Sequence, residues 1–335
     1  MNFKFTIYKP LLLGLSIIIG SLFFLYFSIT KTQIECIDCD FVIKKNDNAY
    51  QIAYRLDSLE VISNSNLFLI ASKLLFLDKS LKPGKYNLSD IQNMKELLLR
   101  LSDPNYDYIS ITIPEGWTIN QISQELVSFN LIDTIVFDSL CNDSAFINLL
   151  GFKEIDNLEG YLFPDTYFIS SNQNEQEIIK MMVQNFQAII ELQKLKFEQY
   201  GFNFDDLLIL ASIIQGEAMA VDEMKIISSV FHNRLNKKMF LDANATLQYV
   251  IPGKNRRLMN KDLKIESRYN TYKYKGLPPG PINNPGLDAI VSACYPYKTE
   301  YIYFVKDPNR FGKHVFSKTF KEHEKARIKY LKSLK

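Results

Sequence analysis

Leu207-Leu208-Ile209-Leu210-Ala211-Ser212-Ile213-Ile214-Gln215-Gly216-Glu217-Ala218 is the run from which the fold of this chain is best read. Its first eight residues are all apolar except Ser212, and a lone carboxylate follows them. Asn203 is a favourable N-cap residue, and the two aspartates after Phe204 place negative charge where a helix N-terminus favours it. The pattern therefore predicts a helix that begins near Phe204 and carries Glu217.

Glu217 falls within the apolar series of this predicted helix. Residues three and four apart share a helix face, so Leu210, Ile213, Ile214 and Glu217 are predicted to form one stripe. A carboxyl group held in such a stripe loses hydration, which raises its pKa and favours the protonated form that a general acid needs near neutral pH. The alternative is that Glu217 ends the stripe and turns to solvent, because glutamate is seldom buried without a partner.

The composition narrows the class of protein. With 335 residues, the chain is long enough for two or three domains. Its net charge is +2 and it has no polybasic stretch with interleaved aromatic residues, so we expect no nucleic-acid partner. Tyrosines gather between Tyr249 and Tyr303, which suits a groove that binds sugars. The alternative explanation is that tyrosine is common in sheets and cores.

The cysteines do not form a metal-binding pattern. Cys36 and Cys39 make a single Cys-x-x-Cys pair with no histidine nearby, whereas a zinc site needs two such pairs or a cysteine and histidine set. We predict no metal and no cofactor, and a local disulfide between these two cysteines stays open.

The N-terminal region has the character of a membrane anchor. Residues 10–30 carry no charge and are almost wholly apolar, and a bilayer core needs about 20 such residues in a helix. The run is too long for a cleaved signal peptide and lacks a small-residue cleavage motif. Lys4 and Lys9 precede it, so the positive-inside rule places residues 1–9 in the cytoplasm and the rest outside. We expect a single-pass protein of the inner (cytoplasmic) membrane with a periplasmic catalytic domain.

Two segments after the anchor share one pattern of a strand, a turn and a helix. Residues 33–105 are predicted to form a small α+β module, and residues 106–155 a second or linking segment. The pairs Asn48/Gln51 and Thr118/Gln121 both have capping-box spacing, and the two segments align at a constant offset. Both resemble LysM-like modules, which bind amino-sugar polymers; the alternative is that they are only spacers. The predicted elements are strands over 41–44, 81–88 (after a turn) and 109–113, and helices over 49–56, 67–77, 94–101 and from 118.

Residues 156–335 are predicted to form a mixed α/β catalytic domain, within an α+β chain overall. Residues 239–286 show little regular structure but are rich in aromatic and apolar residues, which favours an ordered loop that lines a substrate groove. Asn284 and Pro285 suit the N-cap and first residue of the helix that follows this loop. The other predicted elements are helices over 175–199, 222–237, 285–295 and 319–334, and strands over 301–305 and 314–316.

A series of segments in this chain resembles one family. Together with the N-terminal span, they make the chain similar over nearly its whole length to the endolytic murein transglycosylases, the YceG-like proteins. The segments are IPEG (113–116), LEGYLFPDTY (158–167), ASIIQGE (211–217), VFHNRL (230–235), YNTY (269–272), GLPPGPI (276–282), NPG (284–286), YIYFV (301–305) and HVFS (314–317).

The resemblance implies a lytic transglycosylase that cleaves peptidoglycan without a metal or cofactor, with Glu217 as its catalytic acid. The substrate's own 6-hydroxyl would attack, so one carboxylate suffices. Contact with the cell-wall synthesis machinery is a further expectation from the family. The candidate substrate-binding residues are Thr246, Gln248, Tyr269, Asn270, Thr271 and Tyr272.

The chain departs from the family pattern at two places. Gln215 stands where many members have a second glutamate, which leaves Glu217 as the one carboxylate of its motif. Asn244-Ala245-Thr246 stands where Asp-Pro-Thr is expected, which puts in doubt a carboxylate role at position 244. His314 lies in a matched segment, although a lone histidine beside a strand is more often structural.

Two other functions are compatible with the sequence. One is a hydrolase, a two-carboxylate muramidase, that pairs Glu217 with Asp165, Glu159 or Glu223. The other is a non-catalytic, membrane-anchored protein that binds peptidoglycan through the LysM-like segments. The chemistry of the product separates the first from a transglycosylase, and the absence of cleavage would indicate the second.

Overall fold

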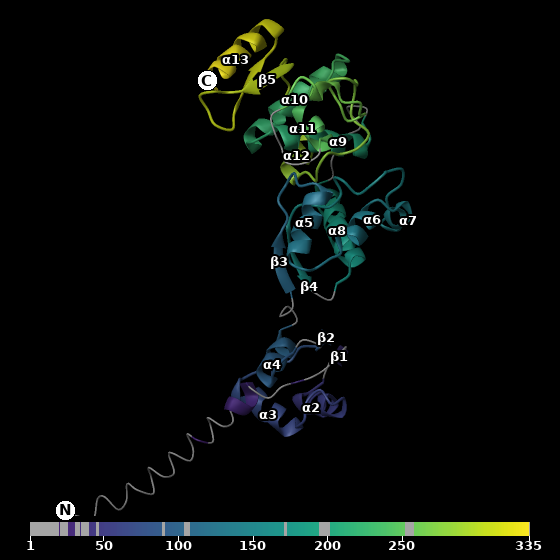
Figure 1. The fold of residues 1–335 in the computed structure, drawn as a ribbon, viewed down its shortest axis with the longest axis vertical. Helices are drawn as coiled ribbons and strands as arrows, with labels where there is room; N and C mark the ends of the chain where they lie inside the picture. Colours follow the sequence, from purple (N-terminus) through teal and green to yellow (C-terminus); the bar gives the residue numbers. More distant parts are fainter. Residues whose placement is uncertain are drawn as a thin grey trace, which may run out of the picture. The chain divides into compact units, whose positions relative to one another are not determined.

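The fold is described from a computed structural model of the chain, which covers residues 20, 26–30, 34, 40–44, 47–88, 91–103, 108–170, 173–193, 202–251 and 258–334. The chain forms two compact units (Figure 1). The first comprises residues up to 109 with 170–172, and the second comprises 110–169 and 173–335. Most of the predicted segment 106–155 therefore belongs to the same unit as 156–335.

The first unit is a small α+β fold around one core. Strand β1 (Asp40–Ile43) pairs antiparallel with β2 (Gly84–Asn87), with Phe41 opposite Tyr86. Among the described residues after β1, the apolar faces of three helices pack into one cluster with the buried side of the sheet. These helices are α2 (Ala49–Ser58), α3 (Ser65–Leu74) and α4 (Met94–Ser102).

The second unit begins with a similar order of elements. Strand β3 (Tyr108–Thr112) pairs with β4 (Thr166–Ser170), and the connection between them is mainly helical. Its helices are α5 (Ile119–Ser128), α6 (Thr134–Cys141) and α7 (Ser144–Leu149), and α8 (Glu175–Gln193) follows the sheet. The predicted extension of α8 to residue 199 lies outside the described residues.

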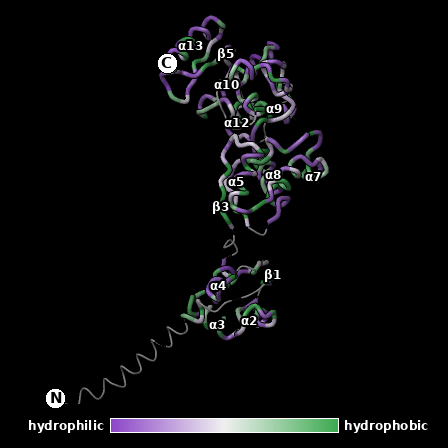
Figure 2. The backbone as a smooth tube through the Cα atoms, in the orientation of Figure 1, coloured by the Kyte–Doolittle hydropathy of each residue, from purple (hydrophilic) through white to green (hydrophobic). Residues whose placement is uncertain are grey.

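The rest of the second unit is built on α9 (Phe204–Glu217), against which α10 (Val221–Asn236), α11 (Asn244–Val250) and α12 (Leu287–Cys294) all pack. The antiparallel hairpin of β5 (Tyr303–Lys306) and β6 (His314–Ser317) lies beside α13 (Phe320–Ser333). Figure 2 shows the contrast between the hydrophobic α9 and the largely hydrophilic α13. The mixture of helices and small sheets agrees with the predicted α+β class.

The capping boxes predicted for two helices are confirmed. The side chain of Asn48 accepts a hydrogen bond from the backbone of Gln51 at the start of α2 and is paired reciprocally. Thr118 and Gln121 do the same at the start of α5. In both units a strand leads into a capped helix and then a second helix, and the first strand pairs with the strand that follows the helices.

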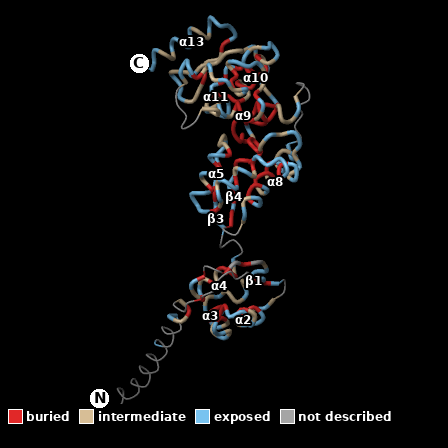
Figure 3. Tube along the Cα trace, turned by 45° about the vertical axis from the view of Figure 1, so that its right-hand side comes forward, coloured by how far each residue is buried: buried red, intermediate tan, exposed pale blue. Residues whose placement is uncertain are grey.

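The helix predicted to carry Glu217 is confirmed, but its burial extends beyond the predicted stripe, because the helix has no solvent-facing side over its apolar run. Every residue from Leu207 to Ile214 is buried (red in Figure 3). A helix that is apolar all round is typical of the centre of a larger fold. The hydroxyl of Ser212 donates to the carbonyl of Ile209 at 2.7 Å, so this polar group is satisfied within the buried run.

The segment 239–286 is more regular than predicted. It contains α11 and a short 3-10 helix, η2 (Asp262–Lys264). The start of α12 also differs from the prediction, because its N-cap is Gly286 and its first residue is Leu287. Asn284 does not cap this helix, because its side chain bonds to two other segments.

The predicted anchor over residues 10–30 lies mostly outside the described residues, as do residues 1–9, Cys36 and Cys39. No helix in the described part of the chain is long and apolar enough to cross a membrane. Cys141 and Cys294 are buried.

Candidate active site

The C-terminal end of α9 is held by the loop that precedes α12. The backbone N–H of Ile282 donates to the hydroxyl of Ser212 at 3.0 Å, and the side-chain amide of Asn283 donates to the Ser212 carbonyl at 2.9 Å. At the other end of the helix, Asn203 and Asp206 form a capping box. The helix is thus fixed at both ends, so the residues of its last turn have defined positions.

Glu217 is the last residue of α9, and its side chain is partly buried. Its Oε1 accepts a hydrogen bond of 2.9 Å from the backbone N–H of Ala245 in the first turn of α11. Burial raises the pKa of Glu217, while the N–H of Ala245, the charge of His314, the N–H of Asn244 and the charge of Lys306 act in the opposite direction. A carboxyl group in this environment can hold a proton at a higher pH than an exposed glutamate.

The first turn of α11 is tied to the loop that contains residues 269–272. The hydroxyl of Thr246 donates to the carbonyl of Ala243 at 2.9 Å and lies 3.0 Å from the hydroxyl of Thr271. The Thr271 hydroxyl in turn accepts from the backbone N–H of Ala243 at 3.0 Å. The hydroxyl of Tyr272 donates to Oδ1 of Asn244 at 2.7 Å. These bonds fix α11 next to Glu217.

The predicted substrate-binding residues divide into two groups by burial. Thr246, Asn270 and Thr271 are buried. The side-chain amide of Asn270 donates to the carbonyls of Leu263 and Ile265 at 3.0 and 2.9 Å, and so closes its own loop. The remaining three are partly exposed: Gln248, Tyr269 and Tyr272.

A buried pair of side chains lies beside the turn that follows Glu217. Oε2 of Glu223 is 2.9 Å from Nδ1 of His314, and Oε1 accepts the backbone N–H of His314 at 3.2 Å. A Cβ on Gly312, just before His314, would lie 3.7 Å from Cβ of Met219. The hairpin of β5 and β6 therefore packs on the turn between α9 and α10, and the carboxyl group of Glu223 contacts both the imidazole and the backbone N–H of His314.

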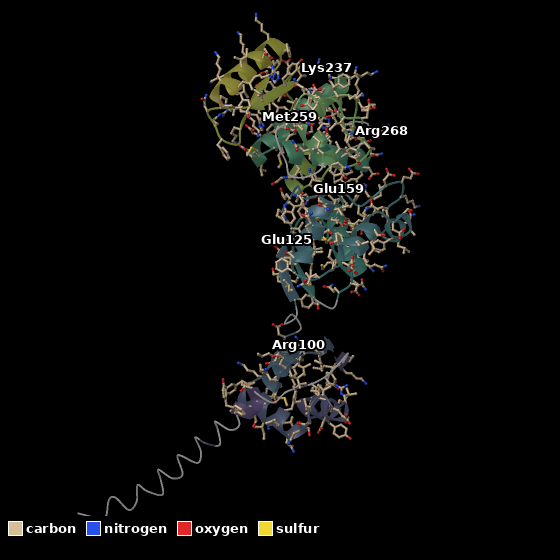
Figure 4. The ribbon with its side chains drawn as sticks, viewed as in Figure 1. Arg100, Glu125, Glu159, Lys237, Met259 and Arg268 are labelled. Atoms are coloured by element: carbon tan, nitrogen blue, oxygen red, sulfur yellow. The ribbon has the colours of Figure 1, made fainter. Side chains whose placement is uncertain are left out.

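A second buried carboxyl group, Glu159, lies at a junction of three segments of the second unit (labelled in Figure 4). Its two oxygens accept the backbone N–H of Ile119 at 3.1 and 3.3 Å, and Oε1 also accepts from the side chain of Asn284 at 3.1 Å. Burial raises the pKa of Glu159 to about 8, with the N–H of Ile119 and the hydroxyl of Tyr249 acting against the shift. This carboxyl group is thus a structural partner of several segments.

Comparison with known proteins places the chain in a family. A model of the YceG-like family matches residues 41–329, which include most of the described residues of both units. The chain belongs to the YceG-like family.

This YceG-like chain is similar in sequence to two curated proteins and in structure to one solved protein. The endolytic murein transglycosylase of Bacillus subtilis (strain 168) is 35% identical over 265 residues, which cover 75% of this chain and 73% of the relative. The protein of the same name from Streptococcus pneumoniae (strain ATCC BAA-255 / R6) is 29% identical over 322 residues, but the match spans only 58% of its length. The crystal structure of a YceG-like protein from Listeria monocytogenes superimposes with a TM-score of 0.60 at 30% identity, covering 86% of this chain and 98% of that one.

Gln215 is also placed in the YceG-like site. Its Oε1 accepts the backbone N–H of Gly286 at 3.1 Å, and its side chain hydrogen-bonds to Glu115. Burial, and then the charge of Asp288, raises the pKa of Glu115. The structure therefore brings the segment 113–116 against the last turn of α9, two residues before Glu217.

The three carboxylates considered as second acids have defined partners. Glu159 and Glu223 are buried in the contacts described above. Asp165 is exposed at the start of β4, where its Oδ2 accepts from the side chain of Asn185 at 2.9 Å. No group of three or more His, Cys, Asp or Glu side chains that could hold a metal ion occurs within the described ranges.

Reasoning from the sequence missed several residues of this site. Glu115 lies in a segment that was singled out, so its presence near α9 could have been proposed. Asn284 is predicted as a helix cap and lies in the matched segment 284–286, but neither pattern indicates its contact with Glu159. Gly216 lets α11 come close to α9, and Ala245 donates its backbone N–H to Glu217. Neither contact has a signal in the local sequence.

Proposed function

We propose that this chain is a membrane-anchored endolytic lytic transglycosylase of peptidoglycan, with Glu217 as its sole general acid and base. It cleaves the β-1,4 bond between N-acetylmuramic acid and N-acetylglucosamine in nascent glycan strands and leaves a 1,6-anhydro end. The enzyme class follows from the family and from relatives that carry the name endolytic murein transglycosylase. The observation that carries the assignment of Glu217 is its partly buried carboxyl group, with a raised pKa, at the end of a buried helix.

In the first step Glu217 acts as an acid. Because burial raises its pKa, the group begins protonated, and it gives this proton to the oxygen that links the two sugars. The bond between this oxygen and C1 of the N-acetylmuramic acid breaks, and the N-acetylglucosamine leaves as an alcohol. Positive charge develops at C1, and the new carboxylate of Glu217 stabilises it.

In the second step the same carboxylate acts as a base. It takes the proton of the 6-hydroxyl of the N-acetylmuramic acid, and the hydroxyl oxygen forms a bond to C1. The product is a 1,6-anhydro sugar, and Glu217 is protonated again. Because the attacking group belongs to the substrate, the second carboxylate that most glycoside hydrolases require is not needed.

We assign substrate contacts to the partly exposed members of the predicted set. Tyr272 and Tyr269 offer rings and hydroxyl groups near α11, and Gln248 offers an amide that suits an N-acetyl group. Thr246, Asn270 and Thr271 are buried and bonded within the protein, so we propose that they support the loop.

We also propose the topology that the sequence predicts. Residues 10–30 anchor the chain in the inner membrane, with residues 1–9 in the cytoplasm and the catalytic domain in the periplasm. The LysM-like segments in 33–105 and 106–155 contact the glycan, and residues 156–335 carry the chemistry. A contact with cell-wall synthesis proteins would place the enzyme on nascent strands.

Mass spectrometry of glycan fragments tests the function directly. Purified peptidoglycan is incubated with the full-length wild-type protein, with E217Q and with E191Q, a matched change at an exposed glutamate of α8. We expect 1,6-anhydro ends from wild type and E191Q and none from E217Q. If E217Q cleaves as fast as wild type, the assignment of Glu217 is wrong.

The same experiment separates the alternatives. Reducing ends formed with water would indicate a two-carboxylate muramidase, in which Glu159, Glu223 or Asp165 acts with Glu217. If the wild-type protein binds peptidoglycan but never cleaves it, the chain is a binding protein.

A further inference from the structure

Gly216 allows an unusually close approach between α9 and α11. A Cβ built on Gly216 would lie 2.7 Å from Cβ of Ala245, a separation that two carbon atoms cannot adopt without movement. The other neighbours of such a Cβ, Asn283 and Ile282, lie at 3.6 and 3.7 Å, which is ordinary contact. Among these neighbours, only Ala245 of α11 lies too close for a residue larger than glycine at position 216.

The close approach of the two helices places a backbone N–H donor of α11 beside the carboxyl group of Glu217. The N–H of Ala245 is 2.9 Å from Oε1, and the residue before Ala245 is the first of α11. The first N–H groups of any helix have no partner inside that helix, so this donor is available at no cost to the helix ladder. The N-cap of α11, Ala243, has no side chain that could satisfy it.

We propose that the contact between Gly216 and Ala245 positions the proton of Glu217: the N–H of Ala245 holds Oε1 as an acceptor, so that Oε2 carries the proton and transfers it to the substrate. This inference rests on the proposed role of Glu217 as the general acid. Ala245 and Gly216 are positioning residues, because both act through Glu217.

Chemical logic supports this division between the two oxygens. A protonated carboxyl group has one hydroxyl oxygen and one carbonyl oxygen, and an N–H donor favours the carbonyl oxygen. When the proton leaves, the N–H stabilises the carboxylate that forms, as a hydrogen bond to a charged group is stronger than one to a neutral group. The contact therefore orients the acid before the reaction and stabilises it afterwards.

The surroundings keep the donor in place. Thr246 and Thr271 are buried and hydrogen-bonded to each other and to Ala243, so the first turn of α11 cannot rotate freely. The other titratable or charged groups that act on Glu217 are His314 on β6, Lys306 on β5 and Tyr272 in the loop after η2. None of these three residues donates a backbone hydrogen bond to Glu217. Among the groups that act on this carboxyl group, only the N–H groups of α11 are backbone donors.

A rescue experiment tests the close approach. G216A places a methyl group against Ala245 and should push α11 away, with an expected loss of about 10- to 100-fold in kcat on purified peptidoglycan. Alanine is a better helix former than glycine, so reduced helix propensity cannot explain a loss. The double variant G216A/A245G removes the opposing methyl group and keeps the backbone N–H. We expect it to regain most of the lost activity.

A proline tests the hydrogen bond itself. A245P removes the N–H at a position where the helix does not use it, and we expect the basic limb of the pH profile of kcat/KM to move up by about one pH unit. The control is Q176P, which puts proline at the second residue of α8, at an exposed position. Circular dichroism of both variants establishes that the helices are retained.

The outcomes are decisive. The proposal is overturned if G216A keeps wild-type kcat, if A245G fails to restore a folded G216A enzyme, or if a folded A245P enzyme keeps the wild-type pH profile. E217Q is measured beside them. An active E217Q would refute the proposed function, whereas an inactive E217Q with an unaffected G216A would refute only the positioning role.

Discussion

The side-chain amide of Asn284 donates a hydrogen bond of 3.1 Å to Oε1 of Glu159, across 125 positions of sequence, and both side chains are buried. The same amide donates to the carbonyl of Trp117 at 2.9 Å, while Oδ1 accepts the N–H groups of Gly160 and Leu162, each at 2.9 Å. One side chain therefore joins three segments, and its hydrogen-bonding capacity is fully used.

N284A should destabilise the protein strongly. The substitution leaves two backbone N–H groups and a carbonyl without this partner in a buried place, which costs about 2–4 kcal/mol of the free energy of unfolding. Urea unfolding followed by circular dichroism measures it. N142A is the matched control, because the side chain of Asn142 is exposed and bonds only to its own helix, and it should change stability by less than about 0.5 kcal/mol. Equal effects of the two variants would contradict the role of Asn284.

Glu159 should make stability depend on pH. Its pKa is about 8 in the folded protein against 4.5 as the ordinary value, so between these pH values the folded state binds more protons than the unfolded state. Stability is then greatest below the lower value and falls as pH rises through the window, by on the order of a few kcal/mol. In E159Q the part of this fall that Glu159 contributes should disappear, because glutamine does not titrate, and the slope should be smaller than in the wild type. Unfolding free energies at pH 5, 6, 7 and 8 measure the slope, with E191Q as the control that should retain it.

The pH profile of activity should reflect Glu217. Burial raises its pKa, so the protonated acid persists above the ordinary carboxyl value of 4.5. We expect kcat/KM on purified peptidoglycan to fall as pH rises through the raised pKa, with a midpoint above 4.5. A basic limb centred at or below that value would show that the group which loses its proton is not a buried carboxyl group.

Tyr272 and Thr271 should respond differently to mutation. Y272F removes a hydroxyl from a partly exposed side chain that we propose contacts the substrate, and should raise KM by about 3- to 10-fold with little change in stability. T271V removes the buried hydroxyl that accepts the N–H of Ala243, and should cost about 1–3 kcal/mol of stability. Steady-state kinetics and thermal unfolding of both variants test the pair. A rise in KM for T271V with unchanged stability would reverse the two assignments.

The sequence was sufficient where local interactions dominate. The capping boxes at Asn48 and Thr118 and the helix that carries Glu217 were predicted from spacing alone, because caps and apolar runs act within a few residues. The family resemblance was also carried by short segments. It predicted Glu217 as the catalytic residue, and that assignment stays a prediction until E217Q is measured.

Tertiary contacts decided the rest. Three helices surround α9, so a predicted stripe became a helix buried on all sides. Asn284 has the chemistry of an N-cap, yet four hydrogen bonds to remote segments outweigh the single bond that a cap supplies, and α12 begins later. The short helix α11 was missed because its start has no side-chain cap within its own sequence.

The sequence by itself predicted which residue types would carry the proposed chemistry and which helix would present the proposed acid. Only the tertiary structure decided what holds that acid: the N–H of Ala245 reaches Glu217 because Gly216 has no side chain to keep α11 away. A backbone donor is present at every residue except proline, so its use depends on which segments meet in space.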